Sequence, residues 1–120
     1  NTSAEADGLV AIGYAAMQGD LASGADNSIG IGNAALQALT SGAGNVAIGY
    51  QALDGITTSA NNTAVGYQAL TACGDSYSNV AIGYQAGDTI ANSGGLNTVI
   101  GTSADVSAGA AENQIVIGKN

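Results

Sequence analysis

Residues 45–53 read NVAIGYQAL, and this stretch decides the fold because it recurs along the chain almost unchanged. It returns as NTAVGYQAL at 62–70 and as NVAIGYQAG at 79–87, with weaker copies at 9–17, 28–36, 97–105 and 114–120. Each copy has a glycine directly after an aliphatic residue, and these anchor glycines are spaced by 19, 17, 17, 17, 18 and 17 residues. They are Gly13, Gly32, Gly49, Gly66, Gly83, Gly101 and Gly118. Such a period is typical of a solenoid whose copies stack on one another.

Each copy opens with a short strand signal. In Val46-Ala47-Ile48 the large residues are two apart, which places them on one face of a strand. Helices fit poorly, because glycine interrupts every copy. We therefore predict an all-β, parallel β-solenoid of about seven 17-residue coils over 9–120, preceded by a lead-in at 1–8.

The two faces of the strand differ in bulk, and this difference predicts the core. Burial of large apolar side chains is the main source of stability, so we expect the bulky face to line the interior. The predicted core residues are Ile12, Ile31, Ile48, Val65, Ile82, Ile100 and Ile117. The small residues between them, such as Ala47 and Ala81, would then form a nearly flat outer face that suits close contact with a second surface.

Stacking brings equivalent positions of successive copies to about 4.8 Å, the spacing between strands. At that distance like side chains can stack or form hydrogen bonds along the stack. We predict ladders of tyrosine, glutamine and asparagine, all with a structural role. Their members are Tyr14, Tyr50, Tyr67 and Tyr84; Gln51, Gln68 and Gln85; and Asn45, Asn62, Asn79 and Asn97. The anchor glycines are expected where the chain turns or where two backbones approach closely.

Composition limits the partners. Nine carboxylates face one cation, Lys119, giving a formal charge of −8, which disfavours a nucleic-acid partner. No apolar run approaches the roughly 20 residues of a membrane span, so no membrane insertion is expected. Cys73 stands alone and cannot form an intrachain disulfide; we expect an inert thiol in a turn, with an interchain contact at a threefold axis as the alternative.

The sequence contains few residues that could carry out catalysis. The chain has no histidine to act as a base, and we expect no enzyme activity, no cofactor and no metal. Asp54, Asp88 and Asp105 could take part in a loop metal site, but solvated turn aspartates are the favoured interpretation. Ice binding needs a regular threonine face, and Thr63 and Thr98 share their offset with aliphatic residues elsewhere, so it stays a minor alternative.

The copies NVAIGYQAL, NTAVGYQAL and NVAIGYQAG resemble two related repeat groups. One is the head repeat of trimeric autotransporter adhesins, with a pattern close to N-S-V-A-I-G. The other, nearer match is the tail-fibre repeat of phages and phage-like bacterial proteins, with its recurrent N-T-A-V-G-Y-Q-A-L. The resemblance implies a left-handed β-roll, assembled as a homotrimer and displayed outside the cell or on a virion. It further implies a non-enzymatic rod that spaces or presents a receptor-binding tip. Asn33 and Ala34 in the second copy, and Thr102 and Ser103 in the sixth, depart from the pattern.

The expected partner is the chain itself, and a host-surface glycan or protein would be bound through the full-length fibre. The chain begins at Asn1 without a methionine and stops two residues after Gly118, which predicts a fragment or processed subunit. A self-assembling extracellular filament is the alternative, because end-to-end contact would place Gly118 and the next Gly13 15 residues apart, nearly in register. Loops 19–27, 54–61, 71–78 and 104–113 vary most. Tyr77, outside the tyrosine ladder, is a candidate for stacking on a sugar, although filling a gap between chains is the favoured role.

Overall fold

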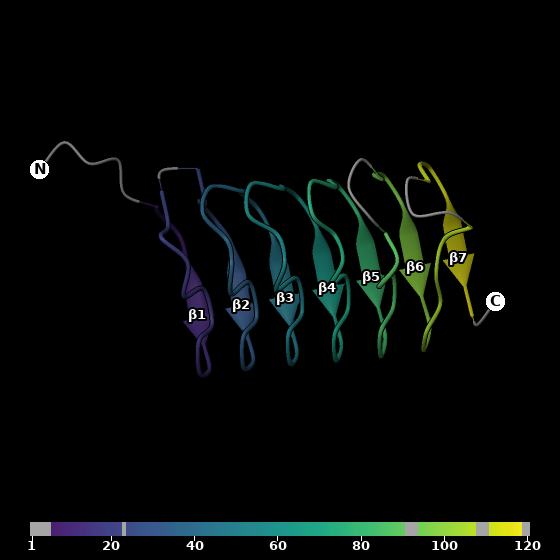
Figure 1. Cartoon of the computed structure of the whole chain (residues 1–120), viewed down its shortest axis with the longest axis horizontal. Coiled ribbons are helices and arrows are strands. Elements are labelled where there is room, and N and C mark those ends of the chain that lie inside the picture. Colours follow the sequence, from purple (N-terminus) through teal and green to yellow (C-terminus); the bar gives the residue numbers. More distant parts are fainter. Residues whose placement is uncertain (1–5, 23, 91–93, 108–110, 119–120) are drawn as a thin grey trace, which may run out of the picture.

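The computed structural model describes residues 6–22, 24–90, 94–107 and 111–118. Within these residues seven short strands form one parallel sheet in chain order (Figure 1). They are β1 (Val10–Ile12), β2 (Ile29–Ile31), β3 (Val46–Ile48), β4 (Thr63–Val65), β5 (Val80–Ile82), β6 (Thr98–Ile100) and β7 (Ile115–Ile117). Six circuits join the seven strands, so the fold is a β-solenoid of about six turns. The predicted all-β parallel solenoid and the predicted strand positions are confirmed.

The strands pair in the register that the repeat predicts. Val46 of β3 lies opposite Thr63 of β4, and Ile48 lies opposite Val65. The first two copies, which are 19 residues apart, pair at the same offset: Val10 lies opposite Ile29. Length variation is therefore absorbed in the loops, and equivalent residues form continuous rows along the sheet.

In the segments that follow the anchor glycines from Gly13 to Gly83, every second residue has a left-handed backbone angle, and these segments are not strands. Gln51 and Leu53 both have left-handed backbone angles, with φ values of 51° and 52°. Such angles cost a non-glycine residue about 1–2 kcal/mol. Hydrogen bonds to both neighbouring coils offset this cost: the Gln51 N–H donates to the Asn33 carbonyl of the preceding coil (2.9 Å), and the Leu53 N–H donates to the Ala69 carbonyl of the following one (3.1 Å).

The anchor glycines lie where two backbones approach, as predicted. Gly49 and Gly66 have φ values of 136° and 142°, which side-chain-bearing residues rarely adopt. A Cβ atom on Gly49 would overlap the carbonyl oxygen of Gly66, and the same relation links the other anchors from Gly13 to Gly83 with the next one. Only glycine allows the coils to approach this closely.

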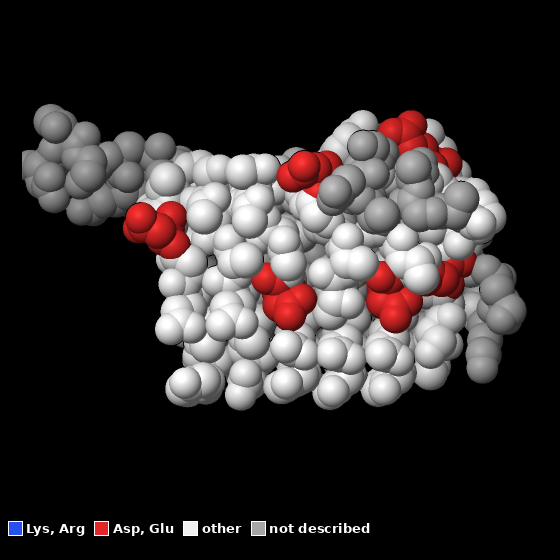
Figure 2. Space-filling model, in the orientation of Figure 1, with Lys and Arg blue, Asp and Glu red and all other residues white. Residues whose placement is uncertain are grey.

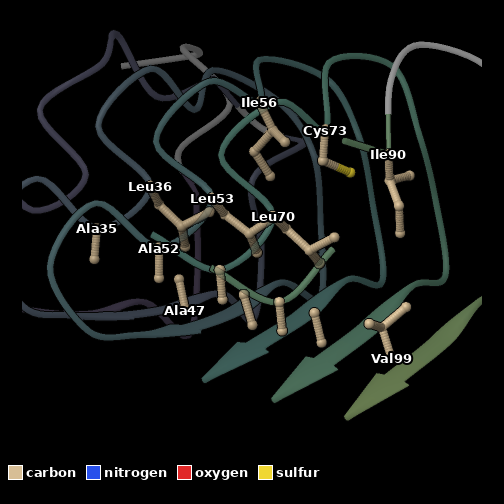
Figure 3. Packing of buried hydrophobic residues seen from close by; sticks show 14 of the residues in the cluster. Ala35, Leu36, Ala47, Ala52, Leu53, Ile56, Leu70, Cys73, Ile90 and Val99 are labelled. Atoms are coloured by element: carbon tan, nitrogen blue, oxygen red, sulfur yellow. The ribbon is translucent and has the colours of Figure 1, made fainter. Parts of the chain in front are cut away.

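The core is narrow and contains the small face of the sheet (Figure 3). Ala47, Ala64, Ala81 and Val99, the central residues of β3 to β6, are fully buried. Large side chains from the returning segments lie across from them. One row contains Met17, Leu36, Leu53 and Leu70, and a second contains Leu39, Ile56, Cys73 and Ile90.

The predicted core row is therefore wrong. Ile48 and Ile82 are 38% and 41% exposed, whereas Ala47 and Ala81 have no exposed surface. The reason is the thinness of the coil: the leucine and isoleucine rows of the returning segments already fill the interior, and only small residues fit opposite them. The strand residues assigned to the core, Ile12, Ile31, Ile48, Val65, Ile82, Ile100 and Ile117, all point outward and are exposed or half-buried.

A buried asparagine ladder joins the coils just before the strands, as predicted. The Asn62 side-chain oxygen accepts the backbone N–H of Asn79 (2.9 Å) and its side-chain amide (3.3 Å), and Asn79 offers the same oxygen to Asn97. Each side-chain amide also donates to a loop carbonyl, as in Asn62 to Ser76 (3.0 Å). Ser28 and Gln114 extend the ladder at its two ends. Among the described residues every buried side-chain nitrogen and oxygen has a hydrogen-bond partner.

The solenoid contacts begin before residue 9. The Asp7 N–H donates to the Asp26 carboxylate (2.8 Å), and the Asp7 carbonyl accepts the Asn27 N–H (2.8 Å). The last residues of the predicted lead-in therefore already belong to the first coil, while residues 1–5 lie outside the described part of the chain.

Candidate functional site

The outward side of the sheet is the main surface feature, and we call it the outer sheet face. It consists of the first and third residues of each strand: Val10, Ile12, Ile29, Ile31, Val46, Ile48, Thr63, Val65, Val80, Ile82, Thr98, Ile100, Ile115 and Ile117. Twelve of these are Ile or Val, half of the chain's 24 Ile, Leu and Val residues, and none is charged. Half of the large aliphatic side chains thus lie outside the core, in two parallel rows.

This surface can bury apolar area but offers few polar groups. Thr63 and Thr98 carry its only hydroxyls, and they lie in one row on either side of Val80. Contiguous apolar surfaces of this kind on soluble proteins mark sites of association. Sequence reasoning located these residues correctly in strands but assigned them to the interior.

A tyrosine stack runs beside the outer sheet face. The rings of Tyr50 and Tyr67 have centroids 5.0 Å apart with an interplanar angle of 14°, and those of Tyr67 and Tyr84 are 5.2 Å apart at 8°. The neighbouring glutamines are also linked, because Gln68 Nε2 donates to Gln51 Oε1 (2.9 Å) and Gln85 Nε2 to Gln68 Oε1 (3.2 Å). Both predicted ladders are confirmed here, except that the second copy has Asn33 at the tyrosine position, so Tyr14 lies outside the stack.

Tyr77, the candidate ligand residue, is close to the next coil of its own chain. It forms an isolated parallel bridge with Gly95, and a Cβ at Gly95 would lie 3.3 Å from ring atoms Cε1 and Cζ. The side chain is still 47% exposed. The ring thus covers the Gly95 backbone, a structural role that leaves only part of its surface available to a ligand.

Cys73 is a core residue rather than a turn residue. It occupies the row of Leu39, Ile56 and Ile90 and has no exposed surface. Burial raises the pKa of its thiol to about 11, which keeps it protonated at neutral pH. The predicted inert thiol agrees with this placement, whereas the alternative contact at a threefold axis is wrong because the sulfur faces the interior.

The acidic residues do not gather into one patch on the face that Figure 2 shows. Two of them nevertheless interact: Asp88 lies beside Asp105 of the following coil. Burial, a hydrogen bond to Asp105 and the negative charge of Asp105 together raise the pKa of the Asp88 carboxyl. Asp105 in turn accepts the backbone N–H groups of Thr89 (3.1 Å) and Val106 (2.9 Å). Sequence reasoning missed this pair because the two residues stand at different offsets from their anchor glycines, five and four residues on.

The raised pKa of Asp88 gives a pH prediction. A carboxyl that holds its proton more tightly in the folded chain favours the folded state when it is protonated. Its contribution to stability therefore increases as the pH falls from neutral through the folded-state pKa towards the ordinary value of 3.8. Asp88→Asn should raise the melting temperature at neutral pH by at most a few degrees, since the group is largely solvated, and should flatten its pH dependence.

Asp20→Asn is the matched control, because it removes the same charge from an exposed position. Thermal melts followed by circular dichroism at several pH values measure both variants. An equal change of pH dependence in the two would mean that overall charge, and not the Asp88–Asp105 contact, is responsible.

The described residues enclose no pocket, and they contain no group of three or more Cys, Asp, Glu or His side chains placed to hold a metal ion. No helix in the described part of the chain is long and apolar enough to cross a membrane. Comparison with family models, with curated proteins and with solved structures found no match to this chain.

Proposed function

We propose that this chain is a non-enzymatic, structural segment of a surface fibre, in which three copies associate in parallel through their outer sheet faces. We further propose the left-handed winding and the display on a virion or bacterial surface that the resemblance to tail-fibre and adhesin repeats implies. In this role the solenoid is a rigid rod that spaces or presents a receptor-binding tip. Its non-enzymatic character rests on the sequence, which has no histidine.

The single observation that carries the proposal is the outer sheet face. Its fourteen positions include twelve Ile or Val residues and no charge, while the nine carboxylates of the chain lie elsewhere. A monomer would keep two largely aliphatic rows partly in contact with water, at a cost of about 25 cal/mol for each Å² of exposed apolar surface. Association of like chains removes that cost, and a narrow solenoid with few large buried side chains gains most from it.

Parallel association makes a specific prediction about contacts. When like chains run in the same direction around an axis, each strand of the outer sheet face lies at the level of the same strand in the neighbouring chains. In an antiparallel pair, β2 would instead face β6, and only the central strand β4 would meet itself. Cysteines introduced at Ile31 in β2 and at Val65 in β4 distinguish the two arrangements, in a background where Cys73→Val removes the native thiol.

In the parallel assembly both Ile31→Cys and Val65→Cys should form interchain disulfides readily under mild oxidation, as shown by non-reducing gels. Thr58→Cys, on an exposed loop position, is the control and should remain almost unlinked. Linkage at Val65 alone would show an antiparallel pair, and equal linkage at all three sites would show random collision; either result contradicts the proposal.

A further inference from the structure

The tyrosine stack holds three phenol rings close together on the surface of the solenoid. Tyr50, Tyr67 and Tyr84 stand at the same offset in three consecutive copies and keep their rings nearly parallel at 5.0 and 5.2 Å. Their side chains are 42%, 43% and 49% exposed. Three phenol groups are thus held in contact and remain accessible from solvent.

The other two tyrosines provide internal comparisons. Tyr77 is 47% exposed, almost the same as Tyr84, but neither stacked pair includes it. Tyr14 is the most exposed at 81%, and the stack does not reach it because the intervening copy has Asn33. Both comparison residues are thus at least about as accessible as the stacked ones, and what sets the three stacked residues apart is their proximity to one another.

Proximity of two phenols permits one defined reaction. Removal of one electron and one proton from a tyrosine leaves a phenoxyl radical, whose unpaired electron is shared between the oxygen and the ring carbons ortho to it. Two such radicals combine by forming a carbon–carbon bond between ortho carbons, and loss of the hydrogen from each carbon to the oxygen restores both aromatic rings. The net change is two tyrosines to one dityrosine, with release of two protons and two electrons.

We propose that the Tyr50–Tyr67–Tyr84 stack is a modification site, at which hydrogen peroxide acting through a one-electron haem peroxidase joins adjacent coils by a dityrosine bond. The peroxide takes up the two electrons and two protons and is reduced to two water molecules, so the reaction balances. The half-exposed phenols can release their protons to solvent. Because the relevant distances lie within one chain, the inference stands whether or not the chain associates.

A covalent bond between Tyr50 and Tyr67 would close a loop of one coil, as a disulfide does in other small proteins. This chain has a single, buried cysteine and cannot form such a disulfide. Dityrosine bonds within the stack would instead join the central coils, which begin with β3, β4 and β5, and would keep these coils from separating.

The test treats the intact chain, at low concentration, with a haem peroxidase and hydrogen peroxide. The measurements are dityrosine fluorescence, the loss of two hydrogens from the intact mass, and identification of the joined peptides by tandem mass spectrometry. Coupling within the chain should occur at 50–67 or 67–84 at least about tenfold more than at any pair with Tyr14 or Tyr77, because the stacked rings are already positioned.

Matched variants test whether the stacked position of the tyrosines determines the coupling. Tyr67→Phe keeps an aromatic ring in the stack but removes the shared partner of both pairs, so intrachain coupling should fall by about tenfold or more. Tyr14→Phe removes the same number of phenols and should leave coupling unchanged. Asn33→Tyr should extend the stack and add coupling that involves Tyr14. Melting curves of the unoxidised variants check that each one folds.

The proposal is overturned if Tyr67→Phe and Tyr14→Phe reduce coupling equally, or if the dityrosine formed joins different chains at random positions. Absence of dityrosine from the native chain, under conditions that couple free tyrosine, overturns it as well.

Discussion

Replacing Ala47 by aspartate is expected to unfold the solenoid, whereas the same replacement at the adjacent Ile48 should leave it folded. Ala47 is fully buried at the centre of β3, across from the leucine row, and has no polar partner for a carboxylate. Burying an unpaired charge costs several kcal/mol, a large share of the stability of a domain this size. Ile48 points to solvent from the outer sheet face and can carry a charge without that cost.

The two variants should also differ in assembly. Ile48→Asp places a charge on the outer sheet face and should separate associated chains, while the circular dichroism of the folded rod is retained. Urea unfolding measures the stability of both variants. The single variants Ala81→Asp and Ile82→Asp repeat the comparison in β5. The inward assignment of the alanine row is wrong if the isoleucine variants unfold and the alanine variants do not.

The second large effect is expected in the asparagine ladder. Asn79 donates its side-chain amide to Asn62 Oδ1 (3.3 Å) and to the Gly94 carbonyl (3.3 Å), and it approaches the Cys73 sulfur (3.9 Å). Asn79→Asp keeps the shape of the side chain but replaces the amide nitrogen by a carboxylate oxygen. That oxygen would face Asn62 Oδ1 and the Gly94 carbonyl oxygen and could not donate to either. A buried charge left without a partner in this way costs about 3–5 kcal/mol, so the variant should be strongly destabilised at neutral pH.

The loss should shrink under acidic conditions, because a protonated carboxyl can donate one of the missing hydrogen bonds. Asn61→Asp is the control, since Asn61 is exposed and its left-handed backbone suits aspartate. We expect a change within about 0.5 kcal/mol for this control in urea unfolding. Similar losses for both variants would mean that charge in this region, and not the ladder, determines stability.

Much of this architecture could be predicted from the repeat alone. The nearly constant spacing of the anchor glycines aligned the copies, and the alternation in Val46-Ala47-Ile48 located the strands. Stacking of the aligned copies then predicted the tyrosine, glutamine and asparagine ladders. The role of the anchor glycines was also predictable, because glycine at a fixed position in every coil indicates a close approach of backbones.

The orientation of the strands could not be predicted by the same reasoning. Alternation of large and small residues defines two faces of a strand but does not show which face lies inside. The expectation that large apolar side chains are buried placed the isoleucine and valine face inside, and this was wrong. The deciding quantity is the width of the coil, which depends on the left-handed backbone at residues such as Leu53 and Leu70. Leucine rarely adopts these angles, so the residue types at these positions did not predict a left-handed backbone.

The most direct test of trimeric association is the mass of the chain in solution, measured by sedimentation equilibrium over a range of micromolar concentrations. Association through the outer sheet face predicts a discrete species of three times the 11.5 kDa of one chain, and a shift to a single chain in Ile48→Asp. A native chain that stays monomeric throughout, or that forms polymers of indefinite length, would contradict association into a trimer.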